Sequence, residues 1–280
     1  MKFEVSAKID YTTLEPCTFV LNIHALNHPQ KILRESFIVE PYTFWEEISP
    51  SSEGNRLVRI TVPNPGDIHF SYRAQVQNAF TAIDCRDHMT TPISQLPPAV
   101  FTYLHPSRYC QSDKLYRFAN HQFGKIENEF SKVLEVTEWI HRNVEYLSGS
   151  TNAETSAYDT VTQQAGVCRD FAHLGIALCR ALTIPARYCS VYAFQLDPQD
   201  FHACFEAYLS GRWIIFDATK LVPLNGFIKI AMGRDAADTA IANLFGNIIG
   251  NSMQINCLQT EGNLEPFFYE PSKWLGICYD

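Results

Sequence analysis

Long hydrophobic runs are missing from this sequence. No stretch reaches the roughly 18 consecutive apolar residues that a membrane-spanning helix needs. The first residues, MKFEVSAKIDYTTLE, also lack the uninterrupted apolar segment of a secretory signal. We therefore expect a cytoplasmic protein that has no membrane as a partner.

Positive charge is scarce as well. The chain has 22 Lys and Arg residues against 30 Asp and Glu residues, which gives a formal net charge of −8. A surface that neutralises nucleic-acid phosphates needs an excess of basic groups, so nucleic acid is not expected as a partner. Charged residues make up 19% of the chain and hydrophobic residues 46%, which predicts a packed globular protein.

The nine cysteines have neither the even count nor the spacing of a disulfide framework, and we expect most of them to be reduced and buried. Closely spaced pairs of ligands, typical of a structural zinc site, are also missing. The potential ligands in the second half of the chain are spread out: Cys168, His173, Cys179, His202 and Cys204. We expect no metal and no cofactor, and the remaining question is whether one thiol is placed to react.

The first hundred residues have the apolar periodicity of β-strands. Apolar side chains recur at every second position in four segments, 3–11, 19–23, 58–62 and 68–76. Turn residues separate these segments, and no helical period lies between them. The pattern predicts an antiparallel β-sandwich domain in residues 1–100.

A different pattern follows the prolines at 97 and 98, which mark a boundary. Apolar spacing predicts an amphipathic helix over 130–144 and a second helix from about 168 to 182, ended by Pro185. Strand patterns come next, with a turn at Ser210-Gly211, in 187–192, 202–209 and 212–217. Residues 101–280 are thus predicted to form an α+β domain in which helices precede an antiparallel sheet.

Cys168 stands at the start of the second predicted helix. A nucleophilic thiol must be present as the thiolate, and the unpaired N–H groups and dipole of a helix start favour its negative charge. Gly166 leaves room there for a tight turn or an approaching substrate. Taken alone, a cysteine near a helix is more often inert packing than a nucleophile.

A cysteine nucleophile also needs a base that takes the proton of its thiol, and the base needs a group that orients it. His202 begins one predicted strand and Asp217 ends the next. In a hairpin that turns at Ser210-Gly211, paired residue numbers sum to about 421 or slightly less, and 202 and 217 sum to 419. The hairpin therefore predicts that His202 and Asp217 lie nearly opposite each other.

These segments resemble bacterial members of the transglutaminase-like superfamily. The resemblance rests on GVCRDFAH at 166–173, CRALTIPARY at 179–188, His202-Ala203 and Phe216-Asp217. It extends over about 104–240, and the N-terminal strands are similar in pattern to the β-domain that precedes this core in many such proteins. The resemblance implies a papain-like core with a Cys-His-Asp triad of Cys168, His202 and Asp217.

One position departs from the commonest family pattern. The residue two after the triad histidine is usually tryptophan, and here it is Cys204. Because residues two apart share a strand face, we expect this smaller side chain to widen the cleft beside the imidazole. For the oxyanion, the Cys168 backbone N–H is the natural first donor, and the second stays open among Trp139, Tyr146 and Gln164.

Two charged groups near these motifs have two interpretations each. Arg169-Asp170 is either an ion pair at the helix start or part of the cleft, and Arg234 with Asp235 and Asp238 is either a surface group or a salt-bridged loop near the site. His173 lies well around the helix from Cys168 and is expected to be a hydrogen-bonded structural residue.

The sequence thus predicts a cysteine acyl-transfer enzyme that attacks peptide or side-chain amides through a thioester, with a peptide or protein as its substrate partner. Hydrolysis, as in a protease or amidase, is favoured. The alternatives are transfer to an amine, as in a transglutaminase, and a non-catalytic peptide-binding scaffold with the same fold.

Overall fold

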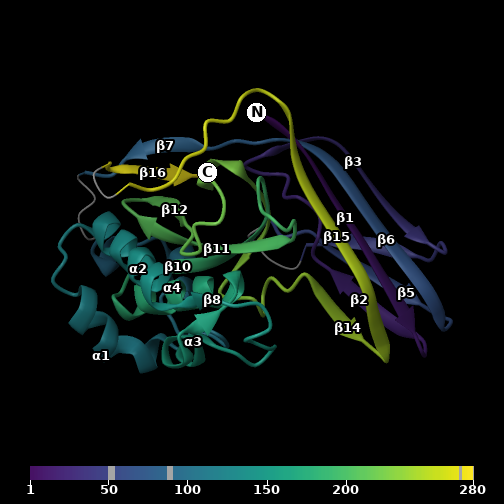
Figure 1. Ribbon diagram of the computed structural model, residues 1–280, viewed down its shortest axis with the longest axis horizontal. Helices are drawn as coiled ribbons and strands as arrows, with labels where there is room; N and C mark the ends of the chain where they lie inside the picture. Colours follow the sequence, from purple (N-terminus) through teal and green to yellow (C-terminus); the bar gives the residue numbers. More distant parts are fainter. Residues whose placement is uncertain (50–53, 87–90, 271–272, 280) are drawn as a thin grey trace.

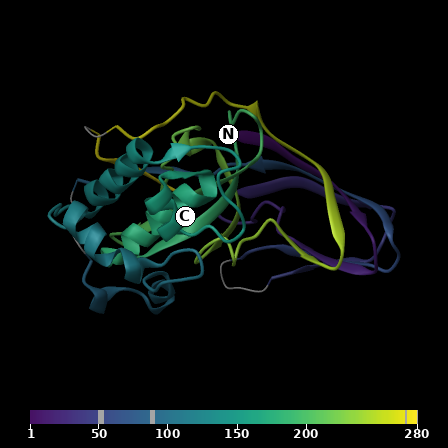
Figure 2. The same ribbon diagram turned by 60° about the horizontal axis from the view of Figure 1, so that its bottom comes forward.

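The computed structural model describes residues 1–49, 54–86, 91–270 and 273–279. It contains a β-sandwich at one end of the molecule and a helix-covered sheet at the other (Figures 1 and 2). The chain is mostly strand with four α-helices among its described residues, so the predicted α+β class is confirmed. Within the described residues, no helix combines the length and apolar character needed to cross a bilayer.

The sandwich consists of two four-stranded antiparallel sheets, with strand orders β15-β1-β6-β3 and β14-β2-β5-β4. Alternate side chains of β1, β2, β5 and β6 are buried between the sheets, as the period-two pattern predicts. The strands are β1 (Lys2–Thr13), β2 (Cys17–Leu21), β3 (Lys31–Glu40), β4 (Trp45–Ile48), β5 (Leu57–Val62), β6 (Gly66–Gln77), β14 (Ala242–Phe245) and β15 (Ile248–Glu261).

The two halves of the chain exchange strands. β14 and β15 come from the C-terminal third and pair with β2 and β1, so that residues after 240 complete both sheets of the sandwich. Conversely, β7 (Thr81–Asp84) leaves the N-terminal half and pairs with β16 (Leu275–Cys278) in the other sheet. The structure therefore divides the chain differently from the contiguous segments 1–100 and 101–280.

The large sheet outside the sandwich has six antiparallel strands in the order β13-β10-β11-β12-β16-β7. Helix α4 packs on β10 and β11, and α1 and α2 contact α4. The remaining elements of this half are α1 (Ser112–Phe123), α2 (Glu129–Asn143), α3 (Ala157–Gln163), α4 (Cys168–Ala181), β8 (Glu145–Tyr146), β9 (Ala165–Gly166), β10 (Ala186–Ala193), β11 (Phe201–Leu209), β12 (Arg212–Phe216) and β13 (Phe227–Gly233), with 3-10 turns at Ile93–Gln95, Pro98–Tyr103 and Leu224–Gly226.

Both predicted helices are present. α2 begins after Asn128, whose side chain accepts a hydrogen bond from the Ser131 N–H at 2.8 Å, and its apolar face lies in the core. α4 is buried almost all round, because it is covered by α1 and α2 as well as by the sheet. This central position fixes the start of α4, and with it Cys168.

The β11–β12 hairpin turns where the sequence predicts. Ser210 and Gly211 both have positive φ, 47° and 87°, as a two-residue turn of type I′ requires. Phe205 pairs with Phe216, so paired residue numbers sum to 421. This register brings the first residues of β11 to the same end of the sheet as the residue that follows β12.

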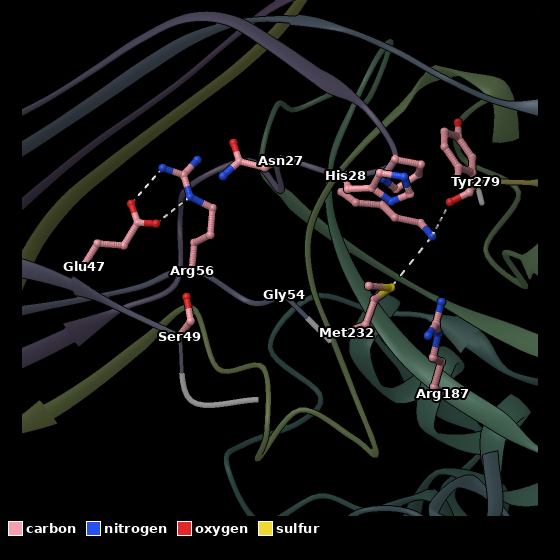
Figure 3. Close-up of a pocket in the computed structure, with 11 residues that line it drawn as sticks. Asn27, His28, Glu47, Ser49, Gly54, Arg56, Arg187, Met232 and Tyr279 are labelled. Carbon is pink, nitrogen blue, oxygen red and sulfur yellow. Dashed lines mark hydrogen bonds and ion pairs between the residues drawn. The ribbon is translucent and has the colours of Figure 1, made fainter. Parts of the chain in front are cut away.

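A pocket of about 560 Å³ separates part of the sandwich from the six-stranded sheet (Figure 3). Arg56 lies on its sandwich side and donates two hydrogen bonds to Glu47, at 2.8 and 2.7 Å. On the sheet side, Lys229 and Arg187 both pair with the buried carboxylate of Glu206. Burial would raise the pKa of Glu206, but these two cations hold it below its ordinary value. Positive charge along this pocket is thus compensated by carboxylates.

Candidate active site

The three residues predicted to act together come from three elements. Cys168 is the first residue of α4, His202 the second residue of β11, and Asp217 follows directly after β12. Cys168 and His202 line one cavity of about 400 Å³, and Asp217 lies behind the imidazole. The structure therefore brings the three side chains together.

His202 and Asp217 form a buried pair. His202 Nε2 lies 2.8 Å from Asp217 Oδ2, and the two side chains are 1% and 2% exposed. Burial would lower the pKa of His202, but the charge and hydrogen bond of Asp217, together with the Cys168 sulfur, raise it to about 10. The imidazole therefore carries a proton at neutral pH. Because Asp217 occupies Nε2, the other nitrogen, Nδ1, is the one left to face the Cys168 sulfur.

Asp217 is itself held in place by the turn after β12. Its second oxygen, Oδ1, accepts hydrogen bonds from the Thr219 backbone N–H at 2.9 Å and from Thr219 Oγ1 at 2.8 Å. The carboxylate thus has one oxygen fixed by the chain and the other fixed on the imidazole. Such a group orients the histidine and fixes which nitrogen faces the thiol.

Cys168 differs from the other cysteines in its exposure. All nine lie in the described part of the chain and are free thiols; eight are buried and Cys168 is partly exposed. Burial raises the pKa of the Cys85 and Cys110 thiols to about 12, which keeps them protonated and inert. The expectation that most cysteines are reduced and buried is confirmed.

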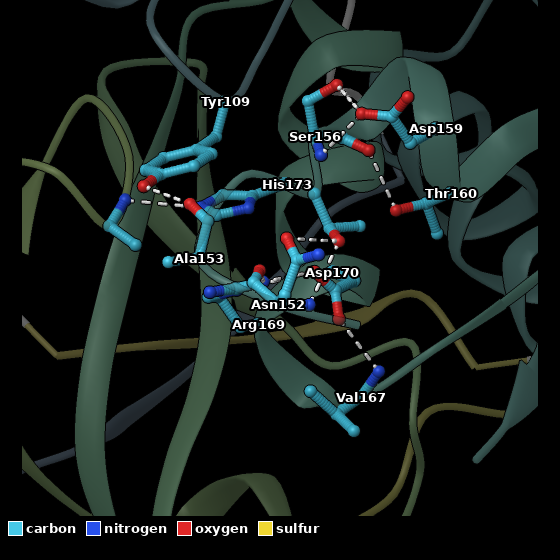
Figure 4. A network of polar contacts seen from close by, with 12 residues as sticks. Tyr109, Asn152, Ala153, Ser156, Asp159, Thr160, Val167, Arg169, Asp170 and His173 are labelled. Carbon is cyan, nitrogen blue, oxygen red and sulfur yellow. Dashed lines mark hydrogen bonds and ion pairs between the residues drawn. The ribbon is translucent and has the colours of Figure 1, made fainter. Parts of the chain in front are cut away.

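The helix start that carries Cys168 is fixed by Asp170. The buried Asp170 carboxylate accepts a hydrogen bond from the Val167 N–H at 3.0 Å, and its other oxygen pairs with Arg169 at 3.1 Å (Figure 4). A Cβ at Gly166 would lie 2.8 Å from the Asp170 Cβ. Gly166 therefore makes room for Asp170, and its predicted part in a tight turn or in the approach of substrate stays a prediction.

Arg169 joins this helix start to the loop before α3. Its Nη2 donates to the Asn152 carbonyl at 2.5 Å as well as to Asp170, and it also lines the cavity (Figure 4). In the same loop, Ser156 is the residue that precedes α3, and its N–H donates to the Asp159 carboxylate at 2.9 Å. Both interpretations of Arg169-Asp170 thus hold: the pair is an ion pair, and its arginine forms part of the cleft.

The segment after β13 forms another wall of the cavity. Its first residues carry the Arg234–Asp238 ion pair, at 2.9 Å, and Asp235 accepts a hydrogen bond from the Tyr109 N–H at 2.9 Å. His173 Nε2 accepts from the Ala236 N–H at 3.1 Å, which confirms the expected structural role of His173. The charged group is therefore a salt-bridged loop beside the site, as one of the two interpretations predicts.

Tyr146 is the candidate oxyanion donor that the structure places against Cys168. The parallel pairing of β8 with β9 sets Tyr146 opposite Gly166, two residues before Cys168. Burial and the Cys168 sulfur raise the pKa of Tyr146 to about 12, although a hydrogen bond from the Cys168 backbone acts in the opposite direction. Trp139 instead packs edge-on against Phe118 in the helical core.

Cys204 does not line the cavity. Its side chain is 1% exposed and belongs to an apolar cluster with Cys189, Val191 and Ile215. The cavity is lined instead by Ala203, from the opposite strand face. His202 lies at the end of β11, whereas Cys204 lies two residues further in, where this cluster covers the face. The prediction that Cys204 widens the cleft is therefore wrong.

The cysteines and histidines that the sequence offers as potential metal ligands, Cys168, His173, Cys179, His202 and Cys204, do not form a ligand group. Over the described ranges, no three or more His, Cys, Asp or Glu side chains are grouped as metal ligands.

Comparison with known proteins identifies the family. Residues 1–99 match the model of the bacterial transglutaminase N-terminal domain, and residues 116–218 match that of the transglutaminase-like superfamily. The crystal structure of a candidate cysteine protease from Cytophaga hutchinsonii is 52% identical, with a TM-score of 0.98 over 100% of this chain and 98% of that one. The uncharacterized protein ML0607 of Mycobacterium leprae is 29% identical over 49% of this chain, and the match spans 52% of that protein's length. The chain belongs to the transglutaminase-like superfamily.

Proposed function

We propose that this cysteine enzyme hydrolyses peptide or side-chain amides through a thioester on Cys168. The observation that carries the proposal is the buried His202–Asp217 pair beside the partly exposed thiol. A pair of buried ionisable groups is costly to maintain, and such pairs next to a reactive side chain in a cavity are typical of active sites. In this proposal Cys168 is the nucleophile, His202 moves protons and Asp217 orients the imidazole.

The first half of the reaction forms the acyl-enzyme. The Cys168 thiolate attacks the amide carbonyl carbon, and the carbonyl π electrons move to the oxygen. As the carbon–nitrogen bond breaks, protonated His202 gives the proton on Nδ1 to the leaving amine. The products of this half are a free amine and a thioester, and neutral His202 keeps its hydrogen bond to Asp217 through Nε2.

The second half releases the acyl group. Neutral His202 accepts a proton from water, the resulting hydroxide attacks the thioester carbonyl, and the carbon–sulfur bond breaks to restore the thiolate. A carboxylic acid leaves, and the His202–Asp217 pair returns to its charged state. Atoms and protons balance with one water consumed for each amide cleaved.

In both halves, negative charge develops on the carbonyl oxygen. The Cys168 backbone N–H is the proposed first donor. The Tyr146 hydroxyl, which the β8–β9 pairing places beside Cys168 and which accepts from that N–H, is the proposed second donor once the carbonyl oxygen replaces it as the acceptor. Tyr146→Phe should lower kcat about 10- to 100-fold with little change in KM. Tyr158→Phe is a matched control, since Tyr146 and Tyr158 are 42% and 43% exposed and Tyr158 lies on α3.

Transfer to an amine is the second candidate, since an amine can replace water in the second half. Water at about 55 M competes unless the cleft excludes it, and the thiol here is partly exposed to solvent. This exposure favours hydrolysis. Incubating the acyl-enzyme with a primary amine in ¹⁸O-labelled water distinguishes the two: hydrolysis puts the label in the released acid, and transfer yields the amide.

Thiol labelling provides the first test of the proposal. Iodoacetamide at about pH 6 should alkylate Cys168, because ordinary thiols with pKa near 8.5 react slowly there. Peptide mass spectrometry then locates the modified residue. Cys168→Ala should fold and lose both labelling and activity, whereas Cys257→Ala, which removes a buried thiol of the sandwich, should retain both. An inert Cys168 in the folded wild type would support the non-catalytic scaffold and contradict the proposal.

A further inference from the structure

The cavity beside Cys168 is built largely from two segments. One is the face of β10 and β11 that carries Tyr188, Ser190 and Ala203. The other is the chain that follows β13, which contributes Ala236 and the run from Thr239 to Ala242. Most side chains of both segments are small, which leaves the cavity open between them. Its volume of about 400 Å³ lies in the range of cavities that enclose small ligands.

Ser190 is the unusual member of this lining. It is 3% exposed, and its Oγ has no hydrogen-bond partner among the described residues. Two other hydroxyls of the cavity are engaged: Thr239 Oγ1 donates to the Asp235 carbonyl at 3.2 Å, and the Tyr109 hydroxyl to the Ala153 carbonyl at 2.8 Å. A buried hydroxyl without a partner costs free energy, which a ligand that bonds it would recover.

The register of the sheet puts Ser190 close to the reacting groups. Ser190 pairs with Ala203, and the next pair along is Val191 with His202. Tyr188, two residues before Ser190 on the same face of β10, also lines the cavity. Rotation about one bond moves a serine Oγ between staggered positions, so the hydroxyl can turn toward a bound molecule without any shift of the strand.

Charge in the described lining of the cavity is limited and already compensated. Apart from the groups assigned to the reaction, the charged side chain is Arg169, which bonds the buried Asp170 carboxylate and the Asn152 carbonyl. A charged substrate side chain entering the cavity would lose water without gaining a free counter-ion. The cavity therefore suits an uncharged group with hydrogen-bonding capacity.

We propose that Ser190 is a substrate-binding residue whose hydroxyl, with that of Tyr188, hydrogen-bonds a main-chain amide of an uncharged peptide segment on the acyl side of the bond that Cys168 attacks. A hydroxyl both donates and accepts, and a peptide amide offers one donor and one acceptor, so the two hydroxyls match it. This inference rests on the proposed function, because it takes Cys168 as the attacking group.

The test compares two reagents that alkylate the same sulfur. Iodoacetamide carries no peptide, whereas N-acetyl-dialanine chloromethyl ketone presents amides on the acyl side. In Ser190→Ala, the second-order rate of Cys168 alkylation by the peptidyl reagent should fall about 3- to 10-fold, as expected for one lost hydrogen bond, and the iodoacetamide rate should stay the same. The melting temperature should not fall, because the hydroxyl that is removed bonds no described protein group.

Cys189→Ala is the matched control, since Cys189 is the neighbouring residue on β10, is buried and lies outside the cavity lining. Its two alkylation rates should keep the wild-type ratio. Versions of the peptidyl reagent with Lys or Glu in place of the terminal alanine should react at least about 10-fold more slowly with wild type.

The outcomes separate the two proposals. If wild-type Cys168 reacts with both reagents but Ser190→Ala leaves their rate ratio unchanged, Ser190 does not bind substrate. A lowered melting temperature with an unchanged ratio would show a structural role instead. Charged reagents as fast as the neutral one would overturn the assignment of an uncharged segment. If Cys168 reacts with neither reagent in wild type, it is the proposed function that fails.

Discussion

His202 Nε2 lies 2.8 Å from Asp217 Oδ2, and the two side chains are almost completely buried. An imidazolium buried with its counter-ion binds its proton much more tightly than one in water, which is why the pKa of His202 rises to about 10. The charge of Asp217 therefore has two consequences: one for the reactivity of Cys168 and one for the stability of the fold.

The Asp217→Asn variant tests the consequence for the reactivity of Cys168. The asparagine keeps the size of the side chain but removes its charge, so the pKa of His202 should fall and the imidazolium should no longer stabilise the thiolate at mildly acidic pH. Amide hydrolysis should drop by about 10²- to 10⁴-fold without reaching zero. The ratio of the iodoacetamide rate at pH 6 to that at pH 9 should fall as well, and an unchanged ratio would show that Asp217 does not tune the pair.

The consequence for stability follows from the direction of the pKa change. Because the pKa of folded His202 is raised, the folded state holds a proton that the unfolded state releases near pH 6.5. The stability contributed by this group is complete below about pH 6.5 and is lost as the pH rises toward 10. Thermal unfolding should therefore show a larger penalty for Asp217→Asn at pH 6 than at pH 10; a penalty that grows with pH would contradict the assignment.

The pairing of His202 with Asp217 was predictable because a two-residue turn fixes the register of a whole hairpin. The turn at Ser210-Gly211 fixes which residues of β11 and β12 pair. A small error in the expected register still leaves His202 and Asp217 within reach of each other. Cys168 was predictable for a similar reason, since the start of a helix follows from local sequence signals. Both features depend on residues close together in the sequence.

The features that could not be predicted depend on contacts between distant segments. β15 has mostly exposed side chains and few buried positions, so it lacks the alternation that marks a half-buried strand, and its pairing with β1 joins the two ends of the chain. β8 and β9 have two residues each, too few for any period to be visible. The position of Tyr146 depends on that short pairing. Gly166 was identified, but its partner, the Asp170 side chain, is known only once the helix start is built.

Gly166 should not tolerate a side chain. In Gly166→Ala the new Cβ would lie 2.8 Å from the Asp170 Cβ, so either the backbone before Cys168 or the Asp170 side chain must move. We expect a loss of about 1–3 kcal/mol in the free energy of unfolding and slower alkylation of Cys168. Gly250→Ala is the control, because its nearest neighbour would be a Tyr11 ring atom at 3.7 Å. Equal stability of the two variants in urea titrations would refute this account of Gly166.

Arg180 should not be replaceable by lysine. Its guanidinium is buried and donates to three backbone carbonyls, of His105, Ala186 and Arg234, and to Ser107 Oγ. A lysine ammonium has three donors at one point and cannot serve all these acceptors, so Arg180→Lys should cost about 2–4 kcal/mol of unfolding free energy.

The same change should loosen the chain after β13, because the Arg234 carbonyl holds that segment to α4 at 2.6 Å. Peptidyl chloromethyl ketone labelling of Cys168 should slow more than iodoacetamide labelling. Arg142→Lys on the surface of α2, where the side chain is 58% exposed, should change stability by less than about 0.5 kcal/mol and serves as the control. A stable Arg180→Lys protein with wild-type labelling would show that the carbonyl contacts are dispensable.

Two adjacent positions on β11 should respond in opposite ways to a larger side chain. Cys204 lies in the apolar cluster with Cys189 and Ile215, so Cys204→Trp has no space to enter and should lower the melting temperature strongly, with equal loss of reactivity toward small and large reagents. Ala203 faces the cavity, so Ala203→Val should slow the peptidyl reagent more than iodoacetamide. Selective loss toward large reagents in Cys204→Trp, with an unchanged melting temperature, would instead place residue 204 in the cleft and overturn the packing seen here.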